Sequence, residues 1–307
     1  MSRVIKNNCP IYPKITEPFY NVYTMINKLD LKIGYKEGKT YLKDTYFTRP
    51  FRLANVGENR PDPALYLMIM SSSPGILDND CYDIEILTEK NARLQLQTQS
   101  YQRLFKMKDG ASQKMVIKLH ENSEISYIQH PIVPHEESIF KAHNSVYMDK
   151  QSIFTYGEII TCGRKHSGEV FLFKKLQNLT EIYSDNKLII KDNILIEPAL
   201  MNIHSMGQLE GYTHQATLLH VNTRNEDINS QAEYIHNLML QEDNIIYGIS
   251  QPLSNSLIIR VLGNGGEQLL DLFKKIEKYL WEQNAPTTRQ LSEKPLIVIE
   301  KIVSSLN

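Results

Sequence analysis

The chain has 307 residues, of which 41% are hydrophobic and 22% are charged, as in an ordinary globular protein. Its 34 lysines and arginines balance 35 aspartates and glutamates, and the net charge of -1 gives no electrostatic case for binding nucleic acid or an anionic membrane surface. Three cysteines, Cys9, Cys81 and Cys162, without a CxxC pair argue against a disulfide framework. Because the sequence shows neither a signal-peptide core nor an apolar run of ~18–20 residues, we expect a cytoplasmic protein without a membrane span.

Short strands dominate the pattern from Tyr41 onward. Residues 1–40 are mixed, and Tyr20–Leu31 within them has the pattern of either a short helix or a strand. Beyond them, alternating or continuous apolar runs are separated by Pro, Gly, Asn and Asp, which is typical of β-strands joined by turns. The expected strands are Ala64–Met70, Tyr82–Leu87, Arg93–Thr98, Met115–His120, Tyr127–Ile132, Ser145–Met148, Ile153–Ile160, Val170–Leu176, Thr180–Tyr183, Lys187–Lys191, Ala216–Val221, Ser256–Leu262 and Leu296–Ile299.

Two helical patterns follow, at about residues 228–241 and 265–282. Ser230 with Glu233, and Asn264 with Glu267, have the spacing of capping boxes at their starts. The second pattern carries a broad apolar stripe, which we expect to cover a sheet face, with partner binding as the alternative. The sequence thus predicts a mainly β fold: a large all-β sandwich or solenoid-like body of many short strands with two α-helices near the C-terminus.

The stretch Tyr156–Glu169 combines three glycines, two acids and an arginine. Gly163 and Gly168 suit tight turns that need a positive φ. Glu158 lies inside an apolar strand, where an unpaired carboxylate is costly, so either Arg164 pairs with it or it faces a wet interior. Because isolated buried acids are usually paired, the residue types favour a hairpin closed by a structural ion pair.

Patterns for catalysis and tight metal binding are weak. The sequence has no GxSxG, HExxH or P-loop motif, which argues against hydrolysis of nucleoside triphosphates. His130 and His135 have side chains that suit nickel or zinc, but the prolines between them extend the loop. Asp78, Asp80 and Asp83 resemble part of a calcium loop without its glycine and terminal glutamate. None of these patterns predicts a catalytic centre or a tightly bound metal.

Several blocks in a fixed order carry a family resemblance. Tyr156–Glu169 fits the pattern E-x(4)-GR-x(3)-GE. The other blocks are Ser73–Asp80, Leu96–Ser100, Pro131–Pro134, Lys191–Asn193 and Gly211–His214. Together they resemble the urease accessory protein family UreD, called UreH in some organisms, over about residues 45–282. Asp78 and Asn79 stand where the family usually has two glycines, and because Asn and Asp tolerate left-handed backbone, the turn can survive.

The resemblance implies one UreD-type domain over residues 1–307, with 1–40 as a poorly matched N-terminal extension. It also implies a non-catalytic maturation chaperone that binds apo-urease and UreF, and through UreF the GTPase UreG. Members are described as an all-β body with an internal water-filled passage for nickel. The resemblance implies no cofactor other than this ion in transit, which a passage should bind weakly and at several points so that it can leave.

On this basis we expect the nickel passage to involve Asp80, Glu158, Arg164, Glu169 and Cys162, with Asp80 and Glu158 facing it. Cys162 is expected to be a buried packing residue, with brief contact between a thiolate and nickel as the alternative.

The second helix is expected to contribute to UreF binding through Leu269, Phe273 and Trp281, directly or by shaping the adjoining surface. Two other functions stay open. One is a pure scaffold, in which a Glu158–Arg164 pair is structural and nickel travels elsewhere. The other is an unrelated all-β ligand-binding module or enzyme, which paired carboxylates ~5–9 Å apart in a cleft would support.

Overall fold

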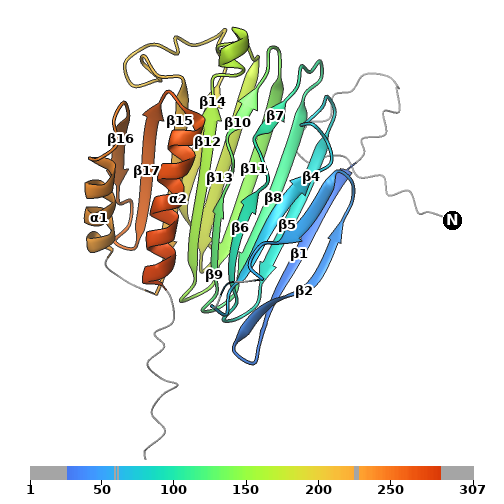
Figure 1. Ribbon diagram of the computed structural model, residues 1–307, viewed down its shortest axis with the longest axis vertical. Coiled ribbons are helices and arrows are strands. Elements are labelled where there is room, and N and C mark those ends of the chain that lie inside the picture. Colours follow the sequence, from blue (N-terminus) through green and yellow to red (C-terminus); the bar gives the residue numbers. More distant parts are fainter. Residues whose placement is uncertain (1–25, 59, 61, 225–227, 285–307) are drawn as a thin grey trace, which may run out of the picture.

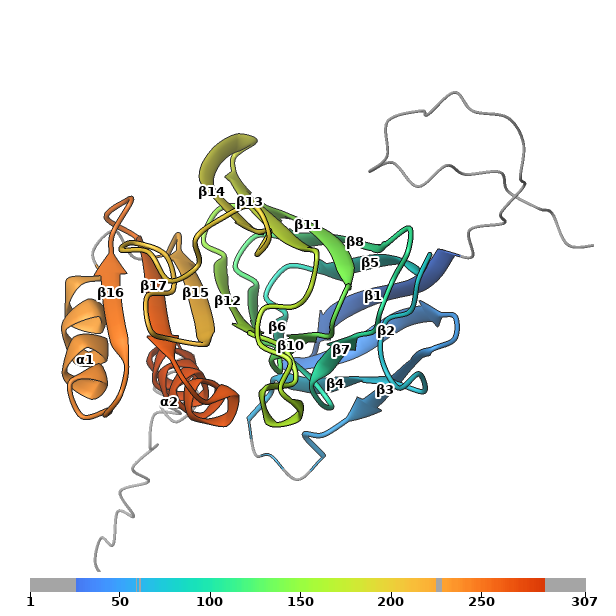
Figure 2. The same ribbon diagram turned by 90° about the horizontal axis from the view of Figure 1, so that it is seen from above.

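Two β-sheets lie face to face and form the body of the protein (Figure 2). The computed structural model describes residues 26–58, 60, 62–224 and 228–284. Sheet A has seven strands in the order β14-β13-β11-β8-β5-β1-β2. Its strands are β1 (Ile26–Lys36), β2 (Lys39–Phe47), β5 (Cys81–Thr88), β8 (Ala111–Leu119), β11 (Ile139–Met148), β13 (Lys175–Ser184) and β14 (Lys187–Ile196).

Sheet B has ten strands, and its main path runs β16-β17-β15-β12-β9-β6-β4-β3, with β10 and β7 attached beside β12. Its strands are β3 (Phe51–Asn55), β4 (Leu65–Ser71), β6 (Arg93–Thr98), β7 (Gln102–Leu104), β9 (Glu124–Ile128), β10 (Ile132–Pro134), β12 (Ile153–Thr161), β15 (His214–Asn222), β16 (Ile246–Ser250) and β17 (Ser256–Gly263). This mainly β sandwich confirms the expected fold class.

The chain winds between the two sheets as a flattened coil. From β4 to β13 the long strands fall alternately in sheet B and sheet A, and neighbours within each sheet are parallel. Antiparallel strands then extend both sheets, β14 in sheet A and β15, β17 and β16 in sheet B. Parallel neighbours in one sheet need a long connection between them. In this coil that connection contains a strand of the other sheet, so consecutive long strands lie in opposite sheets.

Two helices follow the coil, α1 (Asn229–Met239) and α2 (Gly266–Gln283), and α2 lies along the outer face of sheet B (Figure 1). It contacts β9, β12, β15 and β17, and its apolar stripe closes a second core outside the main core between the sheets. No helix in the described part of the chain is long and apolar enough to span a membrane.

Neither expected capping box forms. The helices begin after Ile228 and Gly265, and neither N-cap residue makes a side-chain cap. Asn264 instead accepts hydrogen bonds from the backbone and hydroxyl of Thr213, at 3.1 and 3.0 Å. Asn264 and Glu267 have the spacing of a capping box. The side-chain oxygen of Asn264 that would cap the helix is instead bonded by Thr213.

The expected strand Val170–Leu176 is wrong over its first five residues. Residues 170–174 form an irregular segment in which Phe171 has a φ of 55° and Leu172 is 50% exposed. This segment carries the chain from β12 in sheet B to β13 in sheet A, so the expected hairpin between these strands does not form. The expected strand Leu296–Ile299 lies outside the described residues.

Candidate functional site

A row of polar side chains crosses three adjacent strands of sheet B. The backbone register places Glu158 on β12 opposite Thr217 on β15, and Thr217 opposite Arg260 on β17. Directly opposed residues of neighbouring strands project to the same face of a sheet, so these three side chains form one row. Glu158 and Thr217 are 4% and 1% exposed, so the row runs from the protein interior to the partly exposed Arg260.

A second row faces it from sheet A. Asn144 on β11 is opposite Thr180 on β13, and Thr180 is opposite Asp192 on β14. All three residues are buried. Asn178, two residues before Thr180 on the same strand and therefore on the same face, is buried beside them.

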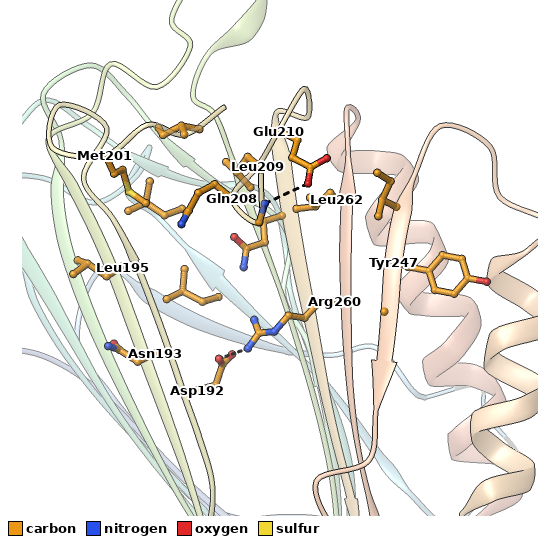
Figure 3. Close-up of a pocket in the computed structure, with 17 residues that line it drawn as sticks. Asp192, Asn193, Leu195, Met201, Gln208, Leu209, Glu210, Tyr247, Arg260 and Leu262 are labelled. Atoms are coloured by element: carbon orange, nitrogen blue, oxygen red, sulfur yellow. Dashed lines mark hydrogen bonds and ion pairs between the residues drawn. The ribbon is translucent and has the colours of Figure 1, made fainter. Parts of the chain in front are cut away.

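Two contacts join the rows across the sandwich. The amide Nδ2 of Asn178 donates to the carboxylate of Glu158. The Nη2 of Arg260 lies 2.5 Å from Oδ1 of Asp192 (Figure 3). The Nη1 of Arg260 donates to Thr217 at 3.2 Å. We call the two rows together with Asn178 and Tyr156 the polar seam.

Glu158 is the buried acid at the centre of the seam, and the expected Arg164 partner is wrong. Burial chiefly, and then the negative charge of Asp192, raise the pKa of Glu158 to about 8, while Arg260 lowers it in part. The hydroxyl of Tyr156 donates to Glu158 at 3.4 Å. At neutral pH Glu158 is therefore mostly protonated, and a cation that approaches it can displace this proton.

Tyr156 continues the seam toward the other side of the sandwich. Its hydroxyl accepts hydrogen bonds from Gln129 at 2.8 Å and from Asn144 at 3.3 Å. The amide oxygen of Asn144 is buried and has no hydrogen-bond partner. A buried oxygen without a donor is a place where a water molecule or a cation would be stabilised.

Cavities lie at both ends of the seam. Asp192, Arg260 and Gln215 line an open cavity of about 530 Å³ between β14 and the strands β15, β17 and β16. Gln113 and Gln129 line a smaller cavity of about 110 Å³. Polar groups therefore extend from one cavity to the other through the interior.

Arg164 pairs with Glu169 instead of Glu158. The Nε of Arg164 donates to Glu169 at 2.9 Å, and this hydrogen bond is the main reason that the pKa of Glu169 is lowered. The strand β12 ends at Thr161, and Gly163, with a φ of 116°, turns the chain away from it. The pair therefore closes the loop after β12 and does not reach the polar seam.

Asp80 and Cys162 also lie apart from the seam. Asp80 is half-buried in the turn before β5, where its carboxylate accepts from the backbone of Leu77 at 2.8 Å and from Tyr82 at 3.3 Å. Asn79 in this turn has a φ of 67°, the left-handed conformation that the replaced glycines would provide. Cys162 is fully buried in the core between the sheets, and burial raises the pKa of its thiol.

Leu269, Phe273 and Trp281 are buried, at 0%, 0% and 7% exposure. Trp281 donates from its indole nitrogen to Tyr66 at 3.2 Å and lies under the guanidinium of Arg93. The direct version of the partner-binding expectation is therefore wrong for this chain, because these side chains pack α2 onto sheet B.

The seam is suited to weak coordination. No group of three or more His, Cys, Asp or Glu side chains within the described ranges is arranged to hold a metal ion. The seam instead offers two carboxylates, Glu158 and Asp192, among neutral oxygen ligands. Such a set favours brief contact with a divalent cation over a closed cage.

Sequence reasoning missed Asn178, Arg260 and any role for Asp192. In Lys187–Ile196 the buried positions are Ile190, Asp192, Ile194 and Ile196, an alternation in which the aspartate occupies an inward position. An aspartate at an inward position of this alternating pattern was the signal from which Asp192 could have been predicted as a site residue. Its pairing with Arg260 depends on contact between the two sheets, which no local pattern reports.

Comparisons with known proteins place the chain among urease accessory proteins. A family model described as "UreD urease accessory protein" matches residues 27–292, so the match begins earlier than residue 45. A "Urease accessory protein UreD" of Flavobacterium johnsoniae is 57% identical over 84% of this chain and 93% of its own length. Proteins with the same description from Acetivibrio thermocellus and Actinobacillus pleuropneumoniae are 30% and 35% identical, over 85% and 81% of this chain and 99% and 94% of their own lengths.

Proposed function

The chain belongs to the UreD family of urease accessory proteins, and from this premise we propose that it passes nickel to apo-urease through the polar seam. The family serves urease maturation and is not itself catalytic. The observation that carries the proposal is the buried Glu158, to which no cationic side chain of the described residues is hydrogen-bonded and which lies between polar groups that reach two cavities.

The chemistry of the seam supports transfer of a divalent cation. Nickel accepts carboxylate and water ligands, and the seam spaces its two acids among amides and hydroxyls. A pathway must bind an ion well enough to admit it and weakly enough to release it. A protonated Glu158 meets both needs. Nickel can bind the carboxylate only by displacing the proton, so binding is possible but weak, and return of the proton releases the ion.

We further propose that the protein works in the cytoplasm in a complex with UreF, with UreG joining through UreF, and with the urease apoprotein as recipient. The burial of α2 indicates which of its faces is available to a partner. Its buried face holds the helix on sheet B, while Lys274, Lys275 and Lys278 lie on its exposed side. The UreF surface is then one that α2 shapes and does not include its apolar stripe.

Substitution of Glu158 tests the nickel pathway. In the complex with UreF and UreG, we expect Glu158→Gln to lower the rate of urease activation severalfold and Glu158→Lys to lower it further, because a fixed positive charge repels the ion. Glu85→Gln, on the exposed outer face of sheet A, is the matched control and should activate urease normally.

Complex formation is measured alongside activation by pull-down. Normal activation by both Glu158 variants in an intact complex would favour the scaffold function, in which nickel takes another route. Loss of activation only together with loss of the complex would mean that Glu158 acts in folding or assembly.

A further inference from the structure

The ion pair between Arg260 and Asp192 closes one end of the polar seam. Arg260 extends from β17 of sheet B toward Asp192 on β14 of sheet A, across the floor of the larger cavity (Figure 3). The arginine side chain is 45% exposed and the aspartate side chain 8% exposed. The guanidinium therefore lies on the solvent side of the carboxylate that it neutralises.

Arg260 is the one positively charged side chain among the described residues that line this cavity. The others are apolar, polar or, at Asp192 and Glu210, acidic. Without Arg260 the cavity floor would attract cations toward Asp192. With Arg260 in place, a cation that comes from solvent meets a like charge first.

The rest of the seam does not need this arginine to satisfy its hydrogen bonds. Glu158 is bonded by Asn178 and Tyr156. The second bond of Arg260, to the Thr217 hydroxyl, is long at 3.2 Å. The guanidinium therefore interacts chiefly with Asp192. Because the arginine side chain is partly exposed, it has room to rotate into the cavity.

We propose that Arg260 is a resident counter-ion that keeps Asp192 closed to cations, so that nickel enters or leaves this end of the seam only when Arg260 moves off the carboxylate. The inference rests on the proposed nickel pathway and adds its regulation. This regulation explains why a cationic side chain lies at the end of a passage for a cation. Arg260 neutralises the Asp192 carboxylate while no nickel ion is bound there.

The test is equilibrium dialysis of the purified full-length chain against Ni²⁺ alone. Removing the arginine charge leaves the Asp192 carboxylate free to bind, so we expect Arg260→Gln to bind Ni²⁺ at least about tenfold more tightly than the wild type. Arg260→Lys keeps the charge and should bind as the wild type does. Arg52→Gln, an exposed arginine on β3, is the matched control and should change nothing.

The double variant Asp192→Asn/Arg260→Gln removes both charges together, and it should lose the tenfold gain. Wild-type affinity in a folded Arg260→Gln, or a gain that survives in the double variant, would overturn the counter-ion proposal. If Glu158→Gln still lowered urease activation in either case, the nickel pathway itself would stand, so the two proposals fail separately.

Discussion

The buried acids that the structure describes are neutralised in different ways. Glu124 pairs with Arg93 at 2.7 Å in the interior, and Asp192 pairs with Arg260 at the cavity. Within the described ranges Glu158 and Glu277 form no ion pair, and burial raises their pKa values to about 8 and about 7. An acid that stays neutral near pH 7 costs little to bury and can release its proton when a cation arrives, which separates these two from structural ion pairs.

Glu277 gives a prediction about stability. It lies on α2 against sheet B, where the hydroxyl of Ser126 donates to it at 2.5 Å. Because its folded pKa is raised, its contribution to folding is complete below about pH 4.5 and is lost as the pH rises through about 7. We expect Glu277→Gln to be more stable than wild type at pH 8, by on the order of 2 kcal/mol, and to differ little at pH 4.

Urea unfolding at both pH values measures this difference. Glu282→Gln, on the same helix with a side chain that is 62% exposed, is the control and should leave both free energies of unfolding unchanged. A Glu277→Gln variant that is less stable than wild type at pH 8 would show that the charged carboxylate stabilises the helix contact.

At the scale of elements, α2 packs closely on β12 because β12 has a glycine under it. A Cβ added at Gly157 would lie 2.7 Å from Cδ1 of Ile128 and 3.1 Å from Cδ2 of Phe273. Gly157 is the residue before Glu158, so it faces the helix while the acid faces the polar seam. The packing of α2 and the position of the seam therefore depend on the same strand.

Gly157→Ala tests this close approach. The added methyl group must displace Ile128 or Phe273, so we expect a loss of about 1–3 kcal/mol in the free energy of unfolding. Gly248→Ala on the edge strand β16 is the control, since nothing lies within 4 Å of its added Cβ, and it should be neutral. Equal stability of the two variants in chemical denaturation would contradict the tight contact.

At the scale of the whole molecule, local pattern predicted most of the described strands and both late helices but not the contacts between sheets. Alternation along β14 and the apolar stripe of α2 are properties of neighbouring residues, and both were readable. Arg164 looked like the partner of Glu158 because it is near in sequence. The coil instead sends Glu158 to Asn178 on the opposite sheet, a contact that depends on the path of the chain from β12 to β13.

The same winding explains why the site was only half predictable. Glu158 stood out because it interrupts an apolar strand, whereas Asp192 and Arg260 became meaningful only once β14 and β17 faced each other across the cavity. The ordered blocks identified the family, and geometry then selected which acids within those blocks lie together. Asp80 and Glu169, in the same blocks, are used in a turn and in a loop closure.

We propose that this member of the UreD family acts in urease maturation as part of a complex with UreF. Co-expression with and without the cognate UreF, followed by pull-down and activation of apo-urease with nickel, tests this proposal. We expect a complex with UreF that activates the apoenzyme, and no activation when this chain is left out. A chain that does not bind UreF and leaves activation unchanged would contradict the account.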